Sequence, residues 1–286
     1  MEKEYRKICY EQEAFKLHHV TGRNIGKAYS QAMHYDTGLT MAYFKTCSGT
    51  IKIEGRTYAL NDGDLILLNY DELHFVSVDS DKYCERITIY VSEQILKCFP
   101  YDGKALFDVF YNRRRGTGNY IPAYLVKANS VDTAFSEILK CCEANNPISN
   151  ILAVCKIIEL LAKLNEEFLW ESERDTLPET ENSVISGVMK YINAHLTEDI
   201  DCDGIAARFH LSKYHLGRMF KANVGISMWD YVIVRRLFLF NDLIRKNDSI
   251  KEACYKVGFH NYSNFYRLYK KHMQISPQDF KNQLEI

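Results

Sequence analysis

The sequence has no long apolar run and almost no net charge. No stretch approaches the roughly 20 consecutive apolar residues that a membrane-spanning helix needs. The N-terminal stretch MEKEYRKICYEQEAFK is charged and lacks the apolar segment of a signal peptide. The nine cysteines are an odd number without regular spacing, which favours reduced thiols over a disulfide framework. These features predict a cytoplasmic chain without membrane contact.

Signatures of several enzyme classes are also missing. The sequence has no G-x-S-x-G, no phosphate-binding P-loop and no H-E-x-x-H. The adjacent pairs His18-His19 and Cys141-Cys142 do not predict chelation, because neighbours on a strand or helix point in different directions. We therefore expect no catalytic residues and no cofactor.

The near-zero net charge conceals an uneven distribution along the chain. From Ser183 onward there are 15 Lys and Arg against 10 Asp and Glu, whereas residues 1–182 hold 21 basic and 27 acidic residues. The polar, acidic segment ESERDTLPETEN coincides with this change and reads as a linker. We predict a domain over 1–170, a linker over 171–182 and a second domain over 183–286.

The two domains differ in periodicity. Between Ile25 and Val91, short apolar or alternating runs separated by turn signals predict strands. From Val131 to the linker the pattern predicts two helices, and after the linker every segment has helical period. The fold class is therefore predicted to be α+β, with a β-domain carrying accessory helices and an all-α domain behind it.

The rear domain contains the same pattern twice, in 205–227 and 253–276. Each copy has a short apolar helix, a tight corner, a helix that starts at a good N-cap (Ser212 or Asn261), and a closing Ile-Ser. This is the arrangement of a double helix-turn-helix. About 18 residues of helix between the copies would span some 27 Å, which suits two reading helices in successive major grooves.

The second helix of each copy has an outward face of cations, aromatics and donors without an acid. Arg and Lys can bond bases and phosphates, and Tyr, Ser and Asn can reach either. The sequence therefore predicts double-stranded DNA as partner. The predicted contacts are Lys213, Tyr214, Arg218, Lys221, Asn261, Tyr262, Ser263, Tyr266, Arg267, Lys270 and Lys271.

The stretch VGFHNYSNFYRLYKKHMQISPQDFK carries a resemblance to a known family. It matches V-G-F, F-x-x-x-F-K and T-P-x-x-[FY]-[RK], and thereby resembles the AraC/XylS-type DNA-binding domain of bacterial transcription regulators, over about 184–281. Tyr269 departs from the usual Phe, Gln274 stands where Gly is common, and Gly217 leaves one usual base-reading position without a side chain.

The front domain also carries a resemblance. The stretch SGTIKIEGRTYALNDGDLILLNYDELH, 48–74, is similar to the cupin-type sensor domain found ahead of such DNA-binding domains. The resemblance implies a small β-barrel or jelly roll with a pocket for a small effector. Strand position suggests Tyr43 and Lys45 as pocket residues, and polar tips near the cupin-like strands suggest Tyr58, His74 and Arg86.

A metal site is not expected in this barrel. The usual cupin ligand positions fall on Asp36, Gly38 and Ala42, and His34 would need a shifted register to take part. His74 by itself falls short of the three protein ligands of a catalytic metal site. We accordingly predict no metal.

The second helix before the linker has two apolar faces. One face has heptad spacing, with Asn165 at an a position, and either packs on the β-domain or forms a dimer seam. The residues predicted for a homodimer seam are Ile151, Val154, Ile158, Leu161 and Phe168.

The function predicted from these features is sequence-specific transcription regulation. The family resemblance implies activation in response to a sugar or metabolite, with RNA polymerase as a further partner. Two alternatives remain open at this point: a metal-dependent cupin enzyme fused to a DNA anchor, and a constitutive DNA-binding protein whose front domain serves to dimerise.

Overall fold

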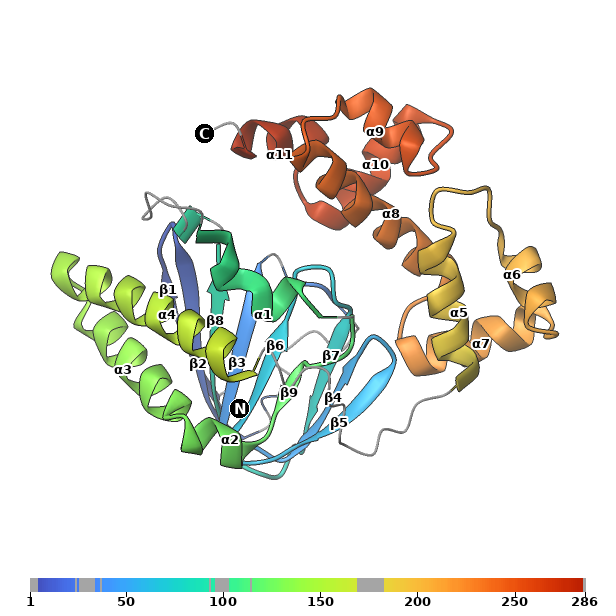
Figure 1. The fold of residues 1–286 in the computed structure, drawn as a ribbon. Helices are drawn as coiled ribbons and strands as arrows, with labels where there is room; N and C mark the ends of the chain where they lie inside the picture. The colour runs from blue at the N-terminus through green and yellow to red at the C-terminus, as the bar shows by residue number, and fades with distance from the viewer. Residues whose placement is uncertain are drawn as a thin grey trace. The chain divides into compact units, whose positions relative to one another are not determined.

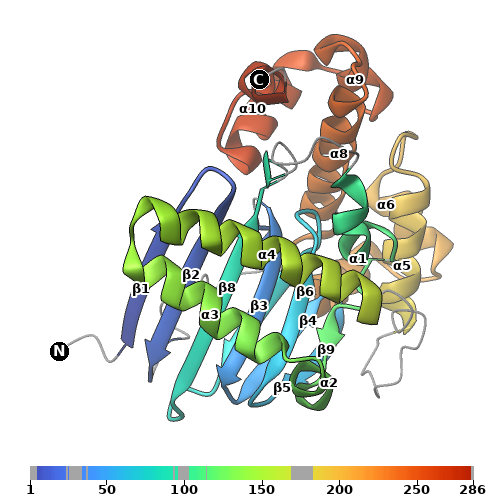
Figure 2. The same ribbon diagram turned by 60° about the vertical axis from the view of Figure 1, so that its left-hand side comes forward.

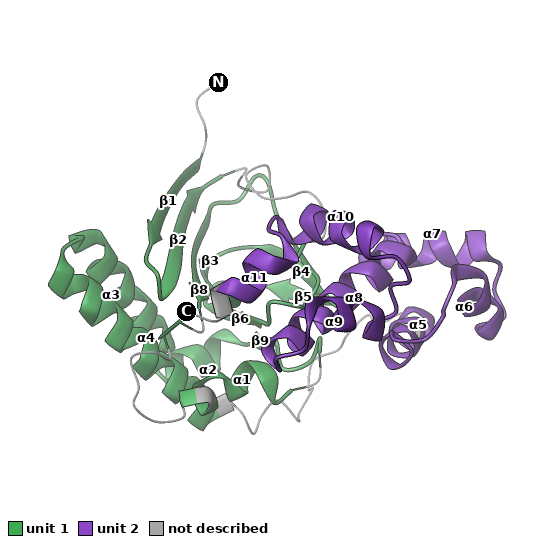
Figure 3. Ribbon diagram, turned by 90° about the horizontal axis from the view of Figure 1, so that it is seen from above, with its two compact units in different colours: residues 1–180 green, residues 181–286 purple. Residues whose placement is uncertain are grey.

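The chain divides into two compact units, residues 1–180 and 181–286 (Figure 3). The structure is a computed structural model and describes residues 5–23, 25, 34–36, 38–92, 94–95, 103–113, 115–168 and 183–284. The predicted linker, 171–182, lies outside the described residues. No helix in the described ranges is long and apolar enough to cross a membrane.

The first unit contains two antiparallel sheets. The larger has the strand order β1-β2-β8-β3-β6-β9 and the smaller has the order β5-β4-β7. The strands are β1 (Tyr5–Glu11), β2 (Phe15–Gly22), β3 (Leu39–Thr46), β4 (Gly49–Ile53), β5 (Arg56–Leu60), β6 (Asp64–Leu68), β7 (His74–Val78), β8 (Cys84–Val91) and β9 (Tyr120–Ile121). The turn between β4 and β5 is the predicted one, with Glu54 and Gly55 both at positive φ.

Helices cover one face of the larger sheet (Figures 1 and 2). They are a 3-10 helix η3 (Gly103–Phe107), α1 (Asp108–Tyr111), α2 (Ala123–Ala128), α3 (Val131–Ala144) and α4 (Pro147–Phe168). Alternate residues of the sheet, such as Met41, Leu65 and Ile89, pack with Phe135 and Ile157 of α3 and α4. The two long helices confirm the helical pattern read from the sequence.

The opposite face of the larger sheet packs on the smaller sheet. Ala42, Phe44 and Ile66 from the first sheet share a core with Ile51 and Leu60 from the second. Because strand residues alternate between faces, each strand of the larger sheet contributes to both cores. This barrel-like arrangement of two sheets with helices outside confirms the predicted fold class for the front unit.

The second unit is helical in all its regular elements within 183–284. Its helices are α5 (Ser183–Ala194), α6 (Cys202–Arg208), α7 (Lys213–Val224), α8 (Met228–Arg245), α9 (Ile250–Lys256), α10 (Tyr262–Met273) and α11 (Pro277–Leu284). The long helix α8 contacts both α7 and α10. The all-α class predicted for this region is confirmed.

The two helix-turn-helix copies share their hydrogen bonds as well as their sequence pattern. The N–H of Leu211 bonds the carbonyl of Ala206 in the first turn, and Phe259 bonds Cys254 in the second. The turn residue has positive φ in both copies, 56° at His210 and 89° at Gly258. Gly258 is restricted further, because an added Cβ would lie 2.9 Å from the guanidinium of Arg236.

Helix caps appear at matching positions of the two copies. Oγ of Ser212 accepts from the N–H of His215 at the start of α7, and Oδ1 of Asn261 accepts from Asn264 at the start of α10. Both sequence-predicted N-caps are thereby confirmed. The helix that follows each closing Ile-Ser is capped in the same way, because Oγ of Ser227 accepts from the N–H of Asp230 and Oγ of Ser276 accepts from the N–H of Asp279.

Candidate nucleic-acid interface and sensor interior

The outward face of α10 brings together most of the predicted DNA contacts of the second copy. Phe265 and Tyr269 are fully buried and fix which face of the helix points inward. Tyr262, Ser263, Tyr266, Arg267, Lys270 and Lys271 are consequently exposed. Since the helix has no acidic residue, its outward surface is positively charged.

Arg267 is held by a neighbour on the same face. Its Nη2 donates to Oδ1 of Asn264, 3.1 Å away. Asn264 is exposed and had not been predicted as a contact. Its position, three residues before Arg267, is the signal that could have found it. Asn261, which had been predicted, uses its side-chain oxygen to cap the helix.

Helix α7 presents an equivalent face in the first copy. Leu216 and Phe220 are buried, and Tyr214, Arg218 and Lys221 point outward, with Tyr214 84% exposed. Lys213 is also exposed, but its Nζ pairs with Asp203 at 2.7 Å. His215 stands three residues before Arg218 on this exposed surface and was not among the predicted contacts.

Gly217 leaves open space on α7. A Cβ built there would meet nothing within 4 Å. The gap lies between the exposed side chains of Tyr214 and Arg218, so this part of the outward face of α7 carries no side chain. The departure from the family pattern at Gly217 therefore removes a side chain from the surface and is not required by packing.

In the front unit, three of the five predicted pocket residues face the space between the two sheets. Arg86 pairs across strands with Val20 and Phe44, which belong to the inter-sheet core, and cross-strand partners share a face. Tyr58 belongs to the same core, and His74 pairs with Ile53 of that core. All three are buried.

The other two predicted pocket residues lie elsewhere, and the prediction needs correction for them. Tyr43 points to the opposite face of β3, where its ring lies 5.3 Å from that of Phe135 in α3. Lys45 is exposed and its Nζ pairs with Glu85 at 3.0 Å. Strand alternation is the physical reason, since Phe44 takes the inter-sheet side and its neighbours cannot.

Further polar groups line the inter-sheet face near Arg86. Thr88 pairs with His18 and Ala42 across the sheet, and in the described part of the chain its buried hydroxyl has no hydrogen-bond partner. The His18 ring packs edge-on against Tyr90. Burial, aided by the charges of Lys7 and Arg86, lowers the pKa of His18 to about 4.

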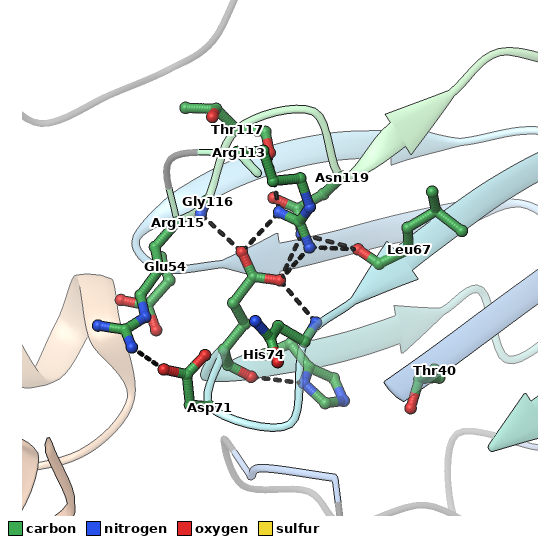
Figure 4. A network of polar contacts seen from close by, with 12 residues as sticks. Thr40, Glu54, Leu67, Asp71, His74, Arg113, Arg115, Gly116, Thr117 and Asn119 are labelled. Carbon is green, nitrogen blue, oxygen red and sulfur yellow. Dashed lines mark hydrogen bonds and ion pairs between the residues drawn. The ribbon is translucent and has the colours of Figure 1, made fainter. Parts of the chain in front are cut away.

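A hydrogen-bond network around Glu72 ties Arg113, Gly116 and Asn119 to the turn before β7 (Figure 4). The fully buried carboxylate accepts from Nη1 and Nη2 of Arg113 at 2.7 and 2.6 Å, from the N–H of Gly116 at 2.8 Å and from Asn119 at 2.8 Å. Burial alone would raise the pKa of Glu72, but the charge and hydrogen bonds of Arg113 outweigh it and hold the pKa below its ordinary value. Arg115 pairs with Asp71 beside it.

The same turn orients His74. Nδ1 of His74 lies 3.0 Å from the carbonyl oxygen of Glu72, and because a carbonyl can only accept, Nδ1 carries the proton. Burial lowers the pKa of this imidazole, against the opposing charge of Asp36. Its Nε2 faces Oδ2 of Asp36 at 3.5 Å.

Two residues that the sequence analysis had set aside as metal ligands lie beside His74. His34 forms an isolated β-bridge with His74, and its ring centroid lies 4.4 Å from that of His74. The prediction of no metal rested on the lack of a second and third ligand here. The structure removes that ground by bringing His34 and Asp36 together with His74.

The predicted dimer seam on α4 also needs correction. Leu161 is fully buried in the core of its own domain, and Val154 and Ile158 pack partly against that core. Asn165 bonds the backbone of Leu106 and Val109, so it serves the domain interior. Of the predicted set Ile151 is well exposed, and the side chain of Phe168 lies outside the described residues. The heptad pattern therefore combines positions that face the core of the domain, such as Leu161, with the exposed Ile151.

Comparison with known sequences finds a matching protein family for each of the two units. Residues 21–161 match the AraC-like ligand binding domain family, and residues 205–283 match a helix-turn-helix domain family. The chain belongs to the AraC family of transcription regulators. The order of the two domains, a ligand-binding type followed by a DNA-binding type, is the one that the sequence resemblance implied.

Individual relatives are regulators as well. The Msm operon regulatory protein of Streptococcus mutans serotype c is 26% identical over 250 residues, 83% of this chain and 81% of that protein. The HTH-type transcriptional activator RhaS of Salmonella arizonae is 26% identical over 125 residues, and the match spans 43% of each chain. Among solved structures, ToxT of Vibrio cholerae is similar over 99% of both chains, at 14% identity and a TM-score of 0.38.

Proposed function

We propose that this AraC-family regulator is a cytoplasmic activator that reads DNA with α7 and α10. The observation that carries the proposal is the equivalence of two acid-free helices, each presented by the same turn and cap. The predicted contacts on both helices are exposed, which DNA contact requires. Helix α8, whose 18 residues rise about 27 Å, would set the two reading helices near the roughly 34 Å repeat of the major groove.

The two reading helices have different roles in this proposal. Helix α10 supplies Arg267, oriented by Asn264, for a base edge, with Lys270 and Lys271 for phosphates. Helix α7 supplies Tyr214, Arg218 and Lys221, with the gap at Gly217 reducing its readout. Sequence preference should consequently be stronger in the half-site bound by α10.

The front domain is proposed to bind a small effector between its sheets. Arg86 and the buried hydroxyl of Thr88 lie on neighbouring pairs of the inter-sheet face, with His18 beside them. A guanidinium and a hydroxyl together suit an effector with a carboxylate or several hydroxyl groups. Tyr58 belongs to the same interior, whereas Tyr43 and Lys45 are excluded from the proposal.

Dimerisation is proposed through the exposed side of α4. Ile148 is 67% exposed, Ile151 60% and Leu152 48%, and they follow helical spacing with the exposed Cys155. An apolar stripe of this kind is expected to be covered in the working molecule. The partner would be a second copy, so that two DNA-binding domains are joined.

The proposal also includes contact with RNA polymerase and regulation without catalysis. Both are in keeping with the regulators among the relatives.

The proposal is tested by selection from a random duplex library followed by fluorescence anisotropy. The selected sequences should contain two conserved blocks about one helical turn apart, with the affinity for them roughly 1,000-fold or more above that for scrambled duplex. A variant with Arg218→Ala and Arg267→Ala should retain weak, salt-sensitive binding without sequence preference. Wild-type protein that enriches no sequence would contradict the proposal.

A further inference from the structure

His34, Asp36 and His74 form a compact group of potential metal ligands. One ligand atom from each residue lies within 4.8 Å of the others. Asp36 and His74 are largely shielded from solvent, with side-chain exposures of 12% and 4%. Among the described residues, it is the one group in which three potential metal ligands approach this closely. It offers two imidazoles and one carboxylate.

The spacing within the group suits an ion better than a direct hydrogen bond. Nε2 of His74 and Oδ2 of Asp36 are 3.5 Å apart, longer than the 2.7–3.2 Å of ordinary hydrogen bonds. Two ligands each about 2.1 Å from a tetrahedral ion lie roughly 3.4 Å apart. The two atoms therefore have the separation that a shared ion would impose.

A second observation concerns the groups behind the ligands. Nδ1 of His74 donates to the Glu72 carbonyl, which directs the Nε2 lone pair toward Asp36. Oγ1 of Thr40 donates to Oδ2 of Asp36 at 2.7 Å and fixes that carboxylate. Metal-binding histidines and carboxylates in proteins are held by outer hydrogen bonds of this kind. The Glu72 network in Figure 4 thus also holds the turn that carries His74.

Backbone geometry supports the same grouping. His34 and His74 exchange two backbone hydrogen bonds, each of 3.0 Å, so the segment before β3 is tied to the start of β7. Asp36 follows His34 by two residues, the spacing that places both on one side of an extended chain. The group is therefore built from two separate parts of the domain.

We propose that His34, Asp36 and His74 bind one divalent first-row transition-metal ion such as Zn²⁺, Mn²⁺ or Fe²⁺. Imidazole ligands favour these ions over Mg²⁺ and Ca²⁺, which prefer oxygen. Three protein ligands leave at least one coordination position for water or for an oxygen atom of an effector. The ion would join the segment that leads into the larger sheet to β7 of the smaller sheet. This inference goes beyond the proposed function and does not depend on DNA binding.

The experiment uses the full chain after removal of metal with a chelator. Titration with Co²⁺, followed by its visible absorption, and elemental analysis after Zn²⁺ loading should both give one ion per chain. Saturating Zn²⁺, at about 100 times its dissociation constant, should raise a melting transition by roughly 5–10 °C. Wild type that binds no ion under these conditions overturns the proposal.

Three variants and a control separate this site from surface binding. Asp36→Asn and His34→Gln each remove one ligand and should weaken binding at least about tenfold. Thr40→Val, which removes the donor to Asp36, should weaken it by about 10–100-fold without changing the stoichiometry. His195→Gln disrupts a histidine–carboxylate pair of similar type in the other unit and should have no effect. Equal uptake by wild type, Asp36→Asn and His34→Gln would mean that the ion binds elsewhere and would refute the assignment.

Folding of the variants is checked by circular dichroism and by their metal-free melting temperatures. His34 is partly exposed, so His34→Gln remains informative if Asp36→Asn does not fold. A folded His34→Gln variant with wild-type affinity for Zn²⁺ would also refute the assignment.

Discussion

The hydroxyl of Tyr269 donates to Oδ1 of Asn241 across 2.7 Å, in the core between α10 and α8. Both side chains are buried. Tyr269 stands where the family pattern has Phe, and the bond explains the departure, since the added hydroxyl satisfies a buried amide oxygen on the central helix.

We predict that Tyr269→Phe lowers the free energy of unfolding by about 1–2 kcal/mol, because it leaves the Asn241 oxygen buried without a donor. Chemical denaturation of the wild type and variant measures the change. The double variant with Asn241→Leu should lose less than the sum of the two single changes, by about 0.5–2 kcal/mol. Tyr266→Phe, at an exposed position of the same helix, is the control and should change stability by less than about 0.5 kcal/mol. Strict additivity would show that the hydrogen bond contributes nothing.

The outward face of α10 should divide by role. Arg267→Ala should weaken specific binding by about 1–3 kcal/mol and relax preference at one base pair, with little loss on scrambled DNA. Asn264→Ala should have a smaller effect in the same direction, because its oxygen orients Arg267. Anisotropy on selected and scrambled duplexes measures both.

Lys270→Ala is the matched comparison on the same helix. It should weaken all sequences alike and reduce the salt slope by about one unit, as expected of a phosphate contact. If Arg267→Ala behaves in this uniform way too, α10 holds the backbone and does not read bases.

The exposed apolar stripe of α4 leads to a prediction about oligomeric state. Changing Ile151 and Leu152 to Asp places two charges in the proposed interface and should weaken dimerisation by roughly 100-fold or more. Because both side chains are exposed, the monomer should stay folded. Sedimentation equilibrium checks the result, with Tyr124→Asp, at another exposed position, as the control. A dimer that survives the double change would place the interface on another surface.

Leu161→Asp should act differently from the changes at the stripe. This residue is fully buried in its own domain, so the variant should unfold the front unit and not merely separate a dimer. Circular dichroism distinguishes the two results. A folded, monomeric Leu161→Asp variant would restore the seam predicted from the heptad pattern.

The pKa of His18 predicts a pH dependence of stability. An unfolded histidine titrates near pH 6.5, whereas His18 in the folded chain titrates at about 4. As the pH falls through this window, the unfolded state takes up a proton that the folded state does not, so stability falls and then levels off. His18→Gln should flatten this part of the profile in calorimetric melts. An unchanged slope, with His215→Gln as the control, would show that His18 is not shielded as the structure indicates.

Much of the rear domain could be predicted from its sequence, because its signals are local. Caps at Ser212 and Asn261, corners at His210 and Gly258, and the spacing of Phe265 and Tyr269 depend on residues within one or two helical turns. Such interactions specify both the helices and the face that each one presents. The outward positions of Arg218 and Arg267 follow from the same periodicity.

The arrangement of side chains in the front domain could not be predicted from the sequence, because its decisive contacts join distant segments. The sequence indicated strands, but the face taken by Tyr43 or Arg86 follows from register between strands, and a shift of one residue reverses it. The first two strands, β1 and β2, precede the region that we read as β. On α4 both faces are apolar, so the choice between Leu161 and Ile151 was decided by packing on the sheet.

The site at His74 shows the same division most clearly. The sequence supplies two histidines and an aspartate, and His34 and Asp36 lie about 40 residues before His74. Their approach requires a β-bridge between the segment before β3 and the start of β7, and it depends on the buried Glu72 carboxylate that holds the turn. The sequence by itself determined helices α7 and α10 and the face that each one exposes, since local hydrogen bonds and helical period suffice there. Only the tertiary structure decided which side chains meet inside the barrel, because strand pairing brings together residues whose separation along the chain carries no periodic signal.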